Sequence, residues 1–223
     1  GAVYNTECES FGCWAFQTEA LGMYSHGDHP DLMMAPDKYD LPNADTIVLY
    51  GCNPAWSQHS SMYWLKNAQK AGVKFVFVGP DYNATAAAMD ARWIRVRPGT
   101  DTKLLLSWFR YIFENKLYDE EFTKYWTNLP FLIDPDTKLP VRAQELFPDF
   151  QQTTPENTPA YVCFDLKTNA VAPFEYSAPA DSAVDPEIFW AGEFNGKQYK
   201  TAGQIYKEEA DPWTLEKTAE ECW

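Results

Sequence analysis

The sequence is poor in cysteine and in basic residues. Its 223 residues include only five cysteines, Cys8, Cys13, Cys52, Cys163 and Cys222, and no two of them have Cys-x-x-Cys spacing. The small, odd number argues against a disulfide framework, and the spacing argues against a closed zinc site made of paired cysteines. Lysine and arginine total 18 against 32 aspartates and glutamates, so the formal net charge is −14. A chain this acidic is not expected to bind nucleic acid by neutralising phosphates.

Long apolar runs are also missing. The longest, such as residues 47–50 and 75–78, are far shorter than the roughly 20 residues that a membrane-spanning helix needs, so no direct membrane insertion is expected. No basic stretch followed by an apolar one opens the chain, so no signal peptide is recognisable. The chain begins with Gly1 rather than Met and ends at Trp223, and we expect it to be a piece of a longer protein.

Histidine is equally scarce, with only His26, His29 and His59 present. The segment Ser-His-Gly-Asp-His at residues 25–29 could form a metal-binding loop. No second cluster of ligands accompanies it, so we interpret it as a polar surface turn ahead of Pro30.

The first 127 residues alternate between strand and helix patterns. Apolar runs at 47–50 and 73–78 end in glycine and proline, which predicts strands, and the run at 47–50 is expected to be buried on both faces. A helical pattern at 57–71 separates them, and a short third strand is expected at 93–96. Strand, helix and strand in this order predict a right-handed unit with parallel strands.

Further helices are expected at residues 101–115 and from Asp119 onward, where acidic residues suit a helix amino terminus. Proline then becomes frequent. Two strands are expected at 161–165 and 171–176.

Another short pair, 189–190 with 197–201, is expected around the hairpin signal Asn195-Gly196. A helix should cover 201–210, and Pro212 can open a second one in its first turn.

The predicted fold class is therefore α/β: a Rossmann-like parallel sheet with flanking helices and an irregular β-rich insertion. We expect the Rossmann-like core with its lead-in at residues 1–127, the insertion at 128–200 and a helical return to the core at 201–223.

Three loops follow the three expected strands, at residues 51–54, 79–85 and 97–101. In a parallel sheet such loops meet at the carboxyl edge, where ligands bind. Neither Gly-x-Gly-x-x-Gly nor a P-loop occurs, and no serine or cysteine nucleophile is paired convincingly with histidine. Spacing alone leaves two alternatives open, a nucleotide-sized ligand at this edge or a purely structural edge.

Four motifs in order resemble the molybdopterin oxidoreductases of the dimethyl sulfoxide reductase family. They lie at residues 46–55, 76–87, 93–101 and 117–122, and the third contains Arg-Pro-Gly-Thr-Asp at its end. Weaker similarity continues at 128–132, 161–165 and 200–207, so the resemblance covers nearly the whole chain. It implies the Rossmann-like domain that binds one guanine dinucleotide arm of a bis-molybdopterin cofactor.

The resemblance implies that Asp101 accepts hydrogen bonds from N1–H and the exocyclic amine of guanine, as a carboxylate can. The alternative is that Asp101 or Thr100 only caps the following helix. By the same resemblance the loops supply the other cofactor contacts: Gly51, Cys52, Asn53, Pro54, Pro80, Asp81, Asn83, Thr85, Arg97, Gly99 and Thr100. For Asn53 the alternative is a plain Asn-Pro turn.

The second loop departs from the family pattern. Many members have an acid directly after the strand, followed by proline and a basic residue. Here the order is Gly79-Pro80-Asp81-Tyr82, so the acid is displaced by two places. The displacement weakens any role for Asp81 at a ribose or guanine edge.

In family members whose molybdenum binds a protein side chain, that residue precedes the first strand of this domain. Cys13 lies at about the distance that the resemblance suggests, and a thiolate is a suitable soft ligand. Ser10 is a rival ligand, and a buried structural cysteine is the alternative for Cys13.

The resemblance implies a fragment of an enzyme that transfers an oxygen atom or hydroxyl with two electrons. The implied cofactors are molybdopterin guanine dinucleotide and molybdenum or tungsten, with any iron–sulfur cluster in parts of the parent beyond this chain. The implied partners are the other domains of the parent and an electron-transfer subunit, and the implied location is extracytoplasmic. We expect the isolated chain to be inactive. The alternatives are a stand-alone nucleotide-binding or interaction module and, more weakly, a small-molecule hydrolase.

Overall fold

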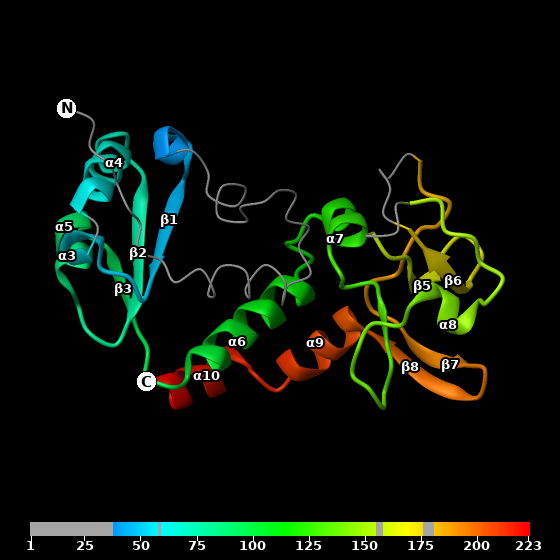
Figure 1. Cartoon of the computed structure of the whole chain (residues 1–223). Helices are drawn as coiled ribbons and strands as arrows, with labels where there is room; N and C mark the ends of the chain where they lie inside the picture. The colour runs from blue at the N-terminus through cyan, green and yellow to red at the C-terminus, as the bar shows by residue number, and fades with distance from the viewer. Residues whose placement is uncertain (1–37, 58, 155–157, 176–180) are drawn as a thin grey trace. The chain divides into compact units, whose positions relative to one another are not determined.

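The computed structural model describes residues 38–57, 59–154, 158–175 and 181–223, which form two compact units. Figure 1 labels most of their helices and strands. Unit 1 contains residues 38–105 together with Leu215–Trp223, and unit 2 contains residues 106–214. The division falls inside helix α6 (Asp101–Glu114), whereas the sequence pattern puts the end of the core at residue 127.

Unit 1 is built on a parallel sheet, as predicted. Its strands are β1 (Thr46–Tyr50), β2 (Lys74–Gly79) and β3 (Arg92–Arg95), and β2 lies between the other two. In the register, Leu49 pairs with Phe77 and Phe77 pairs with Trp93. The apolar runs read from the sequence therefore form the strands of one sheet.

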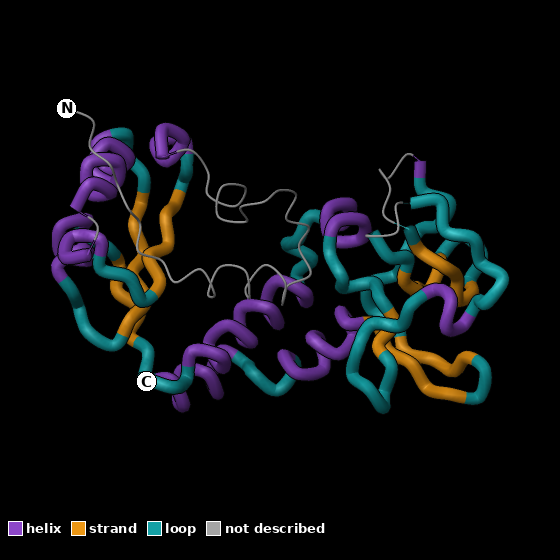
Figure 2. The backbone as a smooth tube through the Cα atoms, viewed as in Figure 1, coloured by secondary structure: helices purple, strands orange, loops and turns teal. Residues whose placement is uncertain are grey.

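Four helical elements accompany this sheet: η1 (Lys38–Asn43), α3 (Pro54–Ser57), α4 (His59–Lys70) and α5 (Ala84–Met89). Figure 2 shows α4 and α5 along one face of the strands. The single helix predicted at 57–71 is divided here into α3 and α4. The crossovers β1–α4–β2 and β2–α5–β3 explain why the three carboxyl ends lie at one edge of the sheet.

The core of unit 1 lies between the sheet and these helices. Phe77 of β2 is 2% exposed and packs with Leu49, Leu65 and Met89, among others. Burying a side chain of this size stabilises the fold by about 1.5–3 kcal/mol. Val48 points to the other face, because side chains alternate along a strand, and it is 50% exposed. The prediction that residues 47–50 are buried on both faces is therefore wrong.

Unit 2 begins with the second part of α6 and continues into α7 (Glu120–Trp126). The Asp119 carboxylate caps α7 by accepting a hydrogen bond from the Phe122 amide at 2.8 Å. The short helix α8 (Ala143–Leu146) follows later. The acidic residues recognised in the sequence do mark the start of a helix.

Antiparallel strands form the rest of unit 2, as expected for the β-rich segment. One sheet has the order β4-β8-β7 and the other pairs β5 with β6. The bounds are β4 (Leu132–Ile133), β5 (Tyr161–Asp165), β6 (Ala170–Phe174), β7 (Ala191–Phe194) and β8 (Lys197–Thr201). Buried residues of both sheets, including Leu132, Val162 and Phe174, form the core.

The hairpin of β7 and β8 turns at Asn195-Gly196, as predicted. Both residues have positive φ, 50° and 77°, as the tight turns that favour Asn-Gly require. The first arm lies at Ala191–Phe194, so the prediction of 189–190 is wrong. A two-residue turn fixes the register of the residues that flank it, and Phe194 pairs directly with Lys197.

Two helices close the described chain. The Thr201 hydroxyl caps α9 (Ala202–Ala210) by accepting from the Gln204 amide at 3.2 Å. Helix α10 runs over Leu215–Cys222 and belongs to unit 1. Pro212 lies in a turn before this helix and not in its first turn, so that prediction is wrong. None of the helices in the described ranges is long and apolar enough to cross a membrane.

The two ends of unit 2 are joined within the unit. The ring of Phe109 on α6 lies 6.0 Å from that of Tyr206 on α9, measured between centroids. Arg110 Nη1 donates to the carbonyl of Asp211 at 2.6 Å. These contacts hold the start of the unit against its end.

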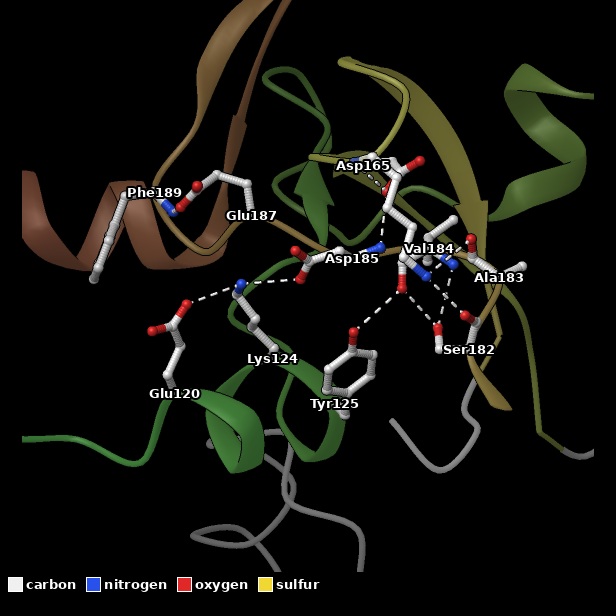
Figure 3. A network of polar contacts seen from close by, with 11 residues as sticks. Glu120, Lys124, Tyr125, Asp165, Ser182, Ala183, Val184, Asp185, Glu187 and Phe189 are labelled. Atoms are coloured by element: carbon white, nitrogen blue, oxygen red, sulfur yellow. Dashed lines mark hydrogen bonds and ion pairs between the residues drawn. The ribbon is translucent and has the colours of Figure 1, made fainter. Parts of the chain in front are cut away.

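A polar network joins α7 to the segment before β7 (Figure 3). Asp165 is 1% exposed, and its carboxylate accepts from the amides of Lys167, Thr168 and Asp185 and from the Thr168 hydroxyl. Lys124 lies 2.9 Å from both Asp185 and Glu120. Burial lowers the pKa of Lys124, but these two acids raise it more, so its pKa lies above the usual value.

Candidate functional site

The candidate site lies at the carboxyl ends of β1, β2 and β3, where three loops meet in unit 1. The first loop begins at Gly51, whose φ of +62° suits glycine. Its amide donates to the carbonyl of Val78 on β2 at 2.8 Å. Gly51 thus still contacts β2, and the chain bends at this residue.

Hydrogen bonds made by side chains connect the first loop to the second. Asn53 Oδ1 accepts from the Thr85 hydroxyl at 2.7 Å and from the Thr85 amide at 3.3 Å. The same hydroxyl accepts from the Ala55 amide at 2.8 Å. Asn83 Nδ2 donates to the Cys52 carbonyl at 3.0 Å. We call these contacts the loop lock.

The loop lock brings together four residues that the sequence predicted to bind a cofactor, Cys52, Asn53, Asn83 and Thr85. Thr85 is completely buried, and Asn83 Oδ1 caps α5 by accepting from the Ala86 amide at 3.0 Å. The described contacts of Thr85 and Asn83 are therefore with the protein itself. Pro54 is buried at the start of α3, which leaves the backbone of residues 51–53 as the exposed or half-buried part of this loop.

The second loop presents Pro80 and Asp81, both of which are exposed. Within the described part of the chain, no hydrogen bond or ion pair involves the Asp81 carboxylate. The neighbouring Tyr82 hydroxyl donates to the Ala86 carbonyl at 3.2 Å. The Asp81 carboxylate is thus exposed at the surface, where solvent or a ligand can contact it. Its role in binding a cofactor stays a prediction.

The third loop is a tight turn from Arg97 to Asp101. Gly99 has a φ of +82°, and the Thr100 hydroxyl donates to the Arg97 carbonyl at 2.7 Å. Thr100 is 7% exposed, whereas Arg97 and Gly99 are exposed. The loop therefore delivers Asp101 to the first position of α6.

The Asp101 carboxylate is half-buried and accepts a hydrogen bond from the Tyr50 hydroxyl, 3.1 Å from Oδ1. Burial and the hydrogen bond to Asp101 together raise the pKa of Tyr50 to about 12. Tyr50 thus stays a protonated donor at neutral pH. An acid at a helix amino terminus is also favoured by the helix dipole.

Helix α10 supports the third loop from the far end of the sequence. The Arg97 amide donates to the Cys222 carbonyl at 2.8 Å, and Cys222 Sγ lies 3.6 Å from the Thr100 carbonyl. Lys103 of α6 forms an ion pair with Glu221.

Sequence reasoning missed Tyr50 and Cys222. The position of Tyr50 at the carboxyl end of a strand was the available signal.

The described residues of the site supply groups suited to binding a ligand. Burial raises the pKa of Cys52, the cysteine in the first loop, and so favours its neutral thiol. Among the residues that the structure describes, no three histidine, cysteine or acidic side chains are placed to hold a metal. The predicted ligand Cys13, its rival Ser10 and the pair His26 and His29 lie outside the described residues.

Comparison with known proteins points to one family. The family model described as "Molybdopterin oxidoreductase" matches residues 5–202. The chain is similar to the alpha chain of the perchlorate reductase of Dechloromonas aromatica (strain RCB), with 34% identity over 140 residues, or 56% of this chain and 15% of that protein.

Two further relatives cover different shares of the chain. The catalytic chain of a putative dimethyl sulfoxide reductase of Halobacterium salinarum is 40% identical over 98 residues, which are 44% of this chain and 12% of that protein. The alpha chain of the dimethylsulfide dehydrogenase of Rhodovulum sulfidophilum is 28% identical over 182 residues, which are 79% of this chain and 19% of that protein. This chain therefore spans less than a fifth of the length of these relatives.

Proposed function

The chain belongs to the molybdopterin oxidoreductase family, and from this premise we propose that unit 1 binds one guanine dinucleotide arm of a molybdopterin cofactor. The observation that carries the proposal is the placement of the Asp101 carboxylate. It is half-buried, it lies at the start of α6, and it stands at the edge where the three loops meet. Ligands of open α/β sheets bind at this edge.

The donor and acceptor chemistry of Asp101 fits guanine. The Watson–Crick edge of guanine offers two adjacent donors, N1–H and the exocyclic amine. A carboxylate has about four lone-pair sites on its two oxygens, and the described contact with Tyr50 takes one of them. Enough acceptors remain for a bidentate, charge-assisted contact, which is stronger than one between neutral groups.

The other loops suit the remaining parts of a dinucleotide. The exposed Arg97 guanidinium can pair with a diphosphate, as arginine commonly does. The backbone of Gly51, Cys52 and Asn53 can contact the ligand closely, because Gly51 has no side chain to obstruct it.

We assign Asn83, Thr85 and Pro54 to the support of these loops, and we keep Gly99 and Thr100 as the turn that presents Asp101. Pro80 and Asp81 remain candidates for the outer end of the arm.

The parent enzyme is proposed to be a molybdenum or tungsten oxidoreductase. When bound, the cofactor would supply oxygen-atom or hydroxyl transfer coupled to two electrons. The residues of this chain would bind and orient one arm through its guanine and phosphates. Other domains of the parent and an electron-transfer subunit would complete the enzyme, since two of the relatives reported above are named as alpha subunits. A protein ligand to the metal, Cys13 or Ser10, stays part of the proposal, as does an extracytoplasmic location.

Replacing Asp101 by Asn tests the proposal in the full-length parent. Asn has nearly the same size but turns one acceptor into a donor, which would face a donor of guanine. Loss of the charged contact should weaken cofactor binding by about 2–3 kcal/mol. The measurements are the molybdopterin guanine dinucleotide content of the purified variant and the melting temperature of its apo form.

The matched control is Asp149→Asn, which changes an exposed acid of unit 2. It should leave both measurements unchanged. If Asp101→Asn lowers the melting temperature but leaves cofactor content as in the parent, Asp101 is a structural cap and the proposed site is wrong.

A further inference from the structure

Tyr50 lies at the end of β1, immediately before the first loop of the site. Its hydroxyl reaches across to Asp101 Oδ1 at 3.1 Å, although the two residues are 51 positions apart in the sequence. Resting on the function proposed above, we propose that Tyr50 is a positioning residue: its hydroxyl orients the Asp101 carboxylate so that both oxygens can accept from guanine.

The need for such a residue follows from the freedom of a carboxylate. The terminal torsion of an aspartate side chain is broad, so the carboxylate plane is poorly fixed by its own rotamer preferences. A bidentate contact with guanine requires both oxygens to lie along the base edge at once. A donor fixed on Oδ1 restricts this torsion before the ligand binds, which reduces the ordering that binding would otherwise require.

The geometry around Tyr50 makes it a dependable donor. Tyr50 and Asp101 are both half-buried, so solvent competes less for their hydrogen bond than at a fully exposed site. Burial and the acid itself raise the pKa of Tyr50 to about 12. The phenol therefore keeps its proton throughout the pH range in which nucleotide binding is measured.

Asp101 is also fixed from its backbone side. Thr100, the residue before it, is held by Arg97 and lies next to Cys222 of α10. The backbone of the acid is thus placed by the third loop and α10, while its carboxylate is placed by β1 through Tyr50. Removal of the hydroxyl should disturb the orientation of the carboxylate without displacing the loop.

The test compares binding of guanosine diphosphate (GDP) and inosine diphosphate (IDP) to the 223-residue chain by isothermal titration calorimetry. IDP lacks the exocyclic amine, so a correctly oriented carboxylate should prefer GDP. Tyr50→Phe keeps the ring and removes the hydroxyl. We expect it to weaken GDP binding about tenfold, the effect of one hydrogen bond to a charged group, and to affect IDP less. The apo melting temperature should change little.

The matched control is Tyr63→Phe, which removes a hydroxyl from a tyrosine of α4 that is 63% exposed. It should leave the ratio of GDP to IDP affinity as in the unchanged chain. A ratio that is also unchanged in Tyr50→Phe overturns the positioning role and leaves the proposed function standing. A loss of GDP preference in Tyr50→Phe but not in Tyr63→Phe supports it.

Failure of the underlying function has a different signature. If the unchanged chain does not prefer GDP to IDP, or if Asp101→Asn keeps that preference, the guanine site itself is wrong and the role of Tyr50 falls with it. If Tyr50→Phe does not fold, 4-aminophenylalanine at position 50 decides, because its ring amine can donate from the position of the hydroxyl. Retained GDP preference in this variant supports the inference, and lost preference overturns it.

Discussion

The loop lock predicts a specific order of stabilities at Thr85. This side chain is completely buried, and its hydroxyl makes two short contacts, one to Asn53 Oδ1 and one from the Ala55 amide. Thr85→Val keeps the shape of the side chain but removes both hydrogen bonds. Asn53 Oδ1 keeps its contact with the Thr85 amide, whereas the Ala55 amide loses its hydroxyl acceptor.

The expected cost of Thr85→Val is about 2–4 kcal/mol. Each hydrogen bond contributes about 0.5–1.5 kcal/mol, and a donor left without an acceptor adds a further penalty. The half-buried position of Ala55 keeps the sum below the cost of a fully buried orphan, because water can approach its amide. Thr85→Ser is the matched variant: it keeps the hydroxyl and loses one methyl group, at about 1 kcal/mol.

Hydrogen exchange read by mass spectrometry is the appropriate assay, because two units need not unfold together. Peptides over residues 51–57 should show faster exchange in Thr85→Val, while peptides of unit 2 should not change. Urea unfolding monitored through unit 1 should place the variants in the order unchanged chain, Ser, Val. If Val proves at least as stable as Ser, the hydroxyl does not hold the loops and the reasoning about the lock is refuted.

Two further predictions concern pH and backbone strain. Burial raises the pKa of the Asp165 carboxyl, but its hydrogen bonds with Asp185, Thr168 and Lys167 lower it more, so its pKa is below the usual range. The stabilisation by the ionised form is therefore complete above the unfolded pKa of about 3.9 and is lost as the pH falls through the folded pKa. Asp165→Asn should lower the free energy of unfolding in urea by about 2–4 kcal/mol at pH 7. If the unchanged chain and the variant differ as much in stability at pH 2 as at pH 7, this reasoning is contradicted. Gly51→Ala should lower the free energy of unfolding by about 1–2 kcal/mol from its positive φ alone, because a Cβ there meets no atom within 4 Å. Gly51→Asn should cost less. Equal melting temperatures for the unchanged chain and both variants would count against strain at this turn.

Local patterns in the sequence were sufficient to predict the sheet. The strands at residues 46–50, 74–79 and 92–95 are apolar or β-branched runs that end near glycine or proline, and such signals depend only on neighbouring residues. The first hairpin arm was misplaced because the aromatic pair Phe189-Trp190 looks like a strand. In the structure the Trp190 amide instead donates to the Thr201 hydroxyl at 3.0 Å.

The candidate site was only partly predictable, because its contacts join distant parts of the chain. The loops could be located because they follow strands. The partner of Asp101 could not, since Tyr50 is 51 positions away, and Cys222 is 122 positions from Thr100. The exposure of Val48 also depends on what covers the second face of the sheet, and a five-residue pattern carries no information about that.

The contact between Arg97 and Cys222 has a consequence for synthesis of the protein. The loop that presents Asp101 is made early, but α10, which supports it, is made only after all of Leu106–Thr214. Bringing together the ends of a flexible segment of about a hundred residues costs about 4 kcal/mol in chain entropy. Unit 2 lowers this cost by holding its own ends together through Phe109, Tyr206, Arg110 and Asp211. A folded unit 2 therefore lowers the entropy cost of docking α10 against the loop that presents Asp101.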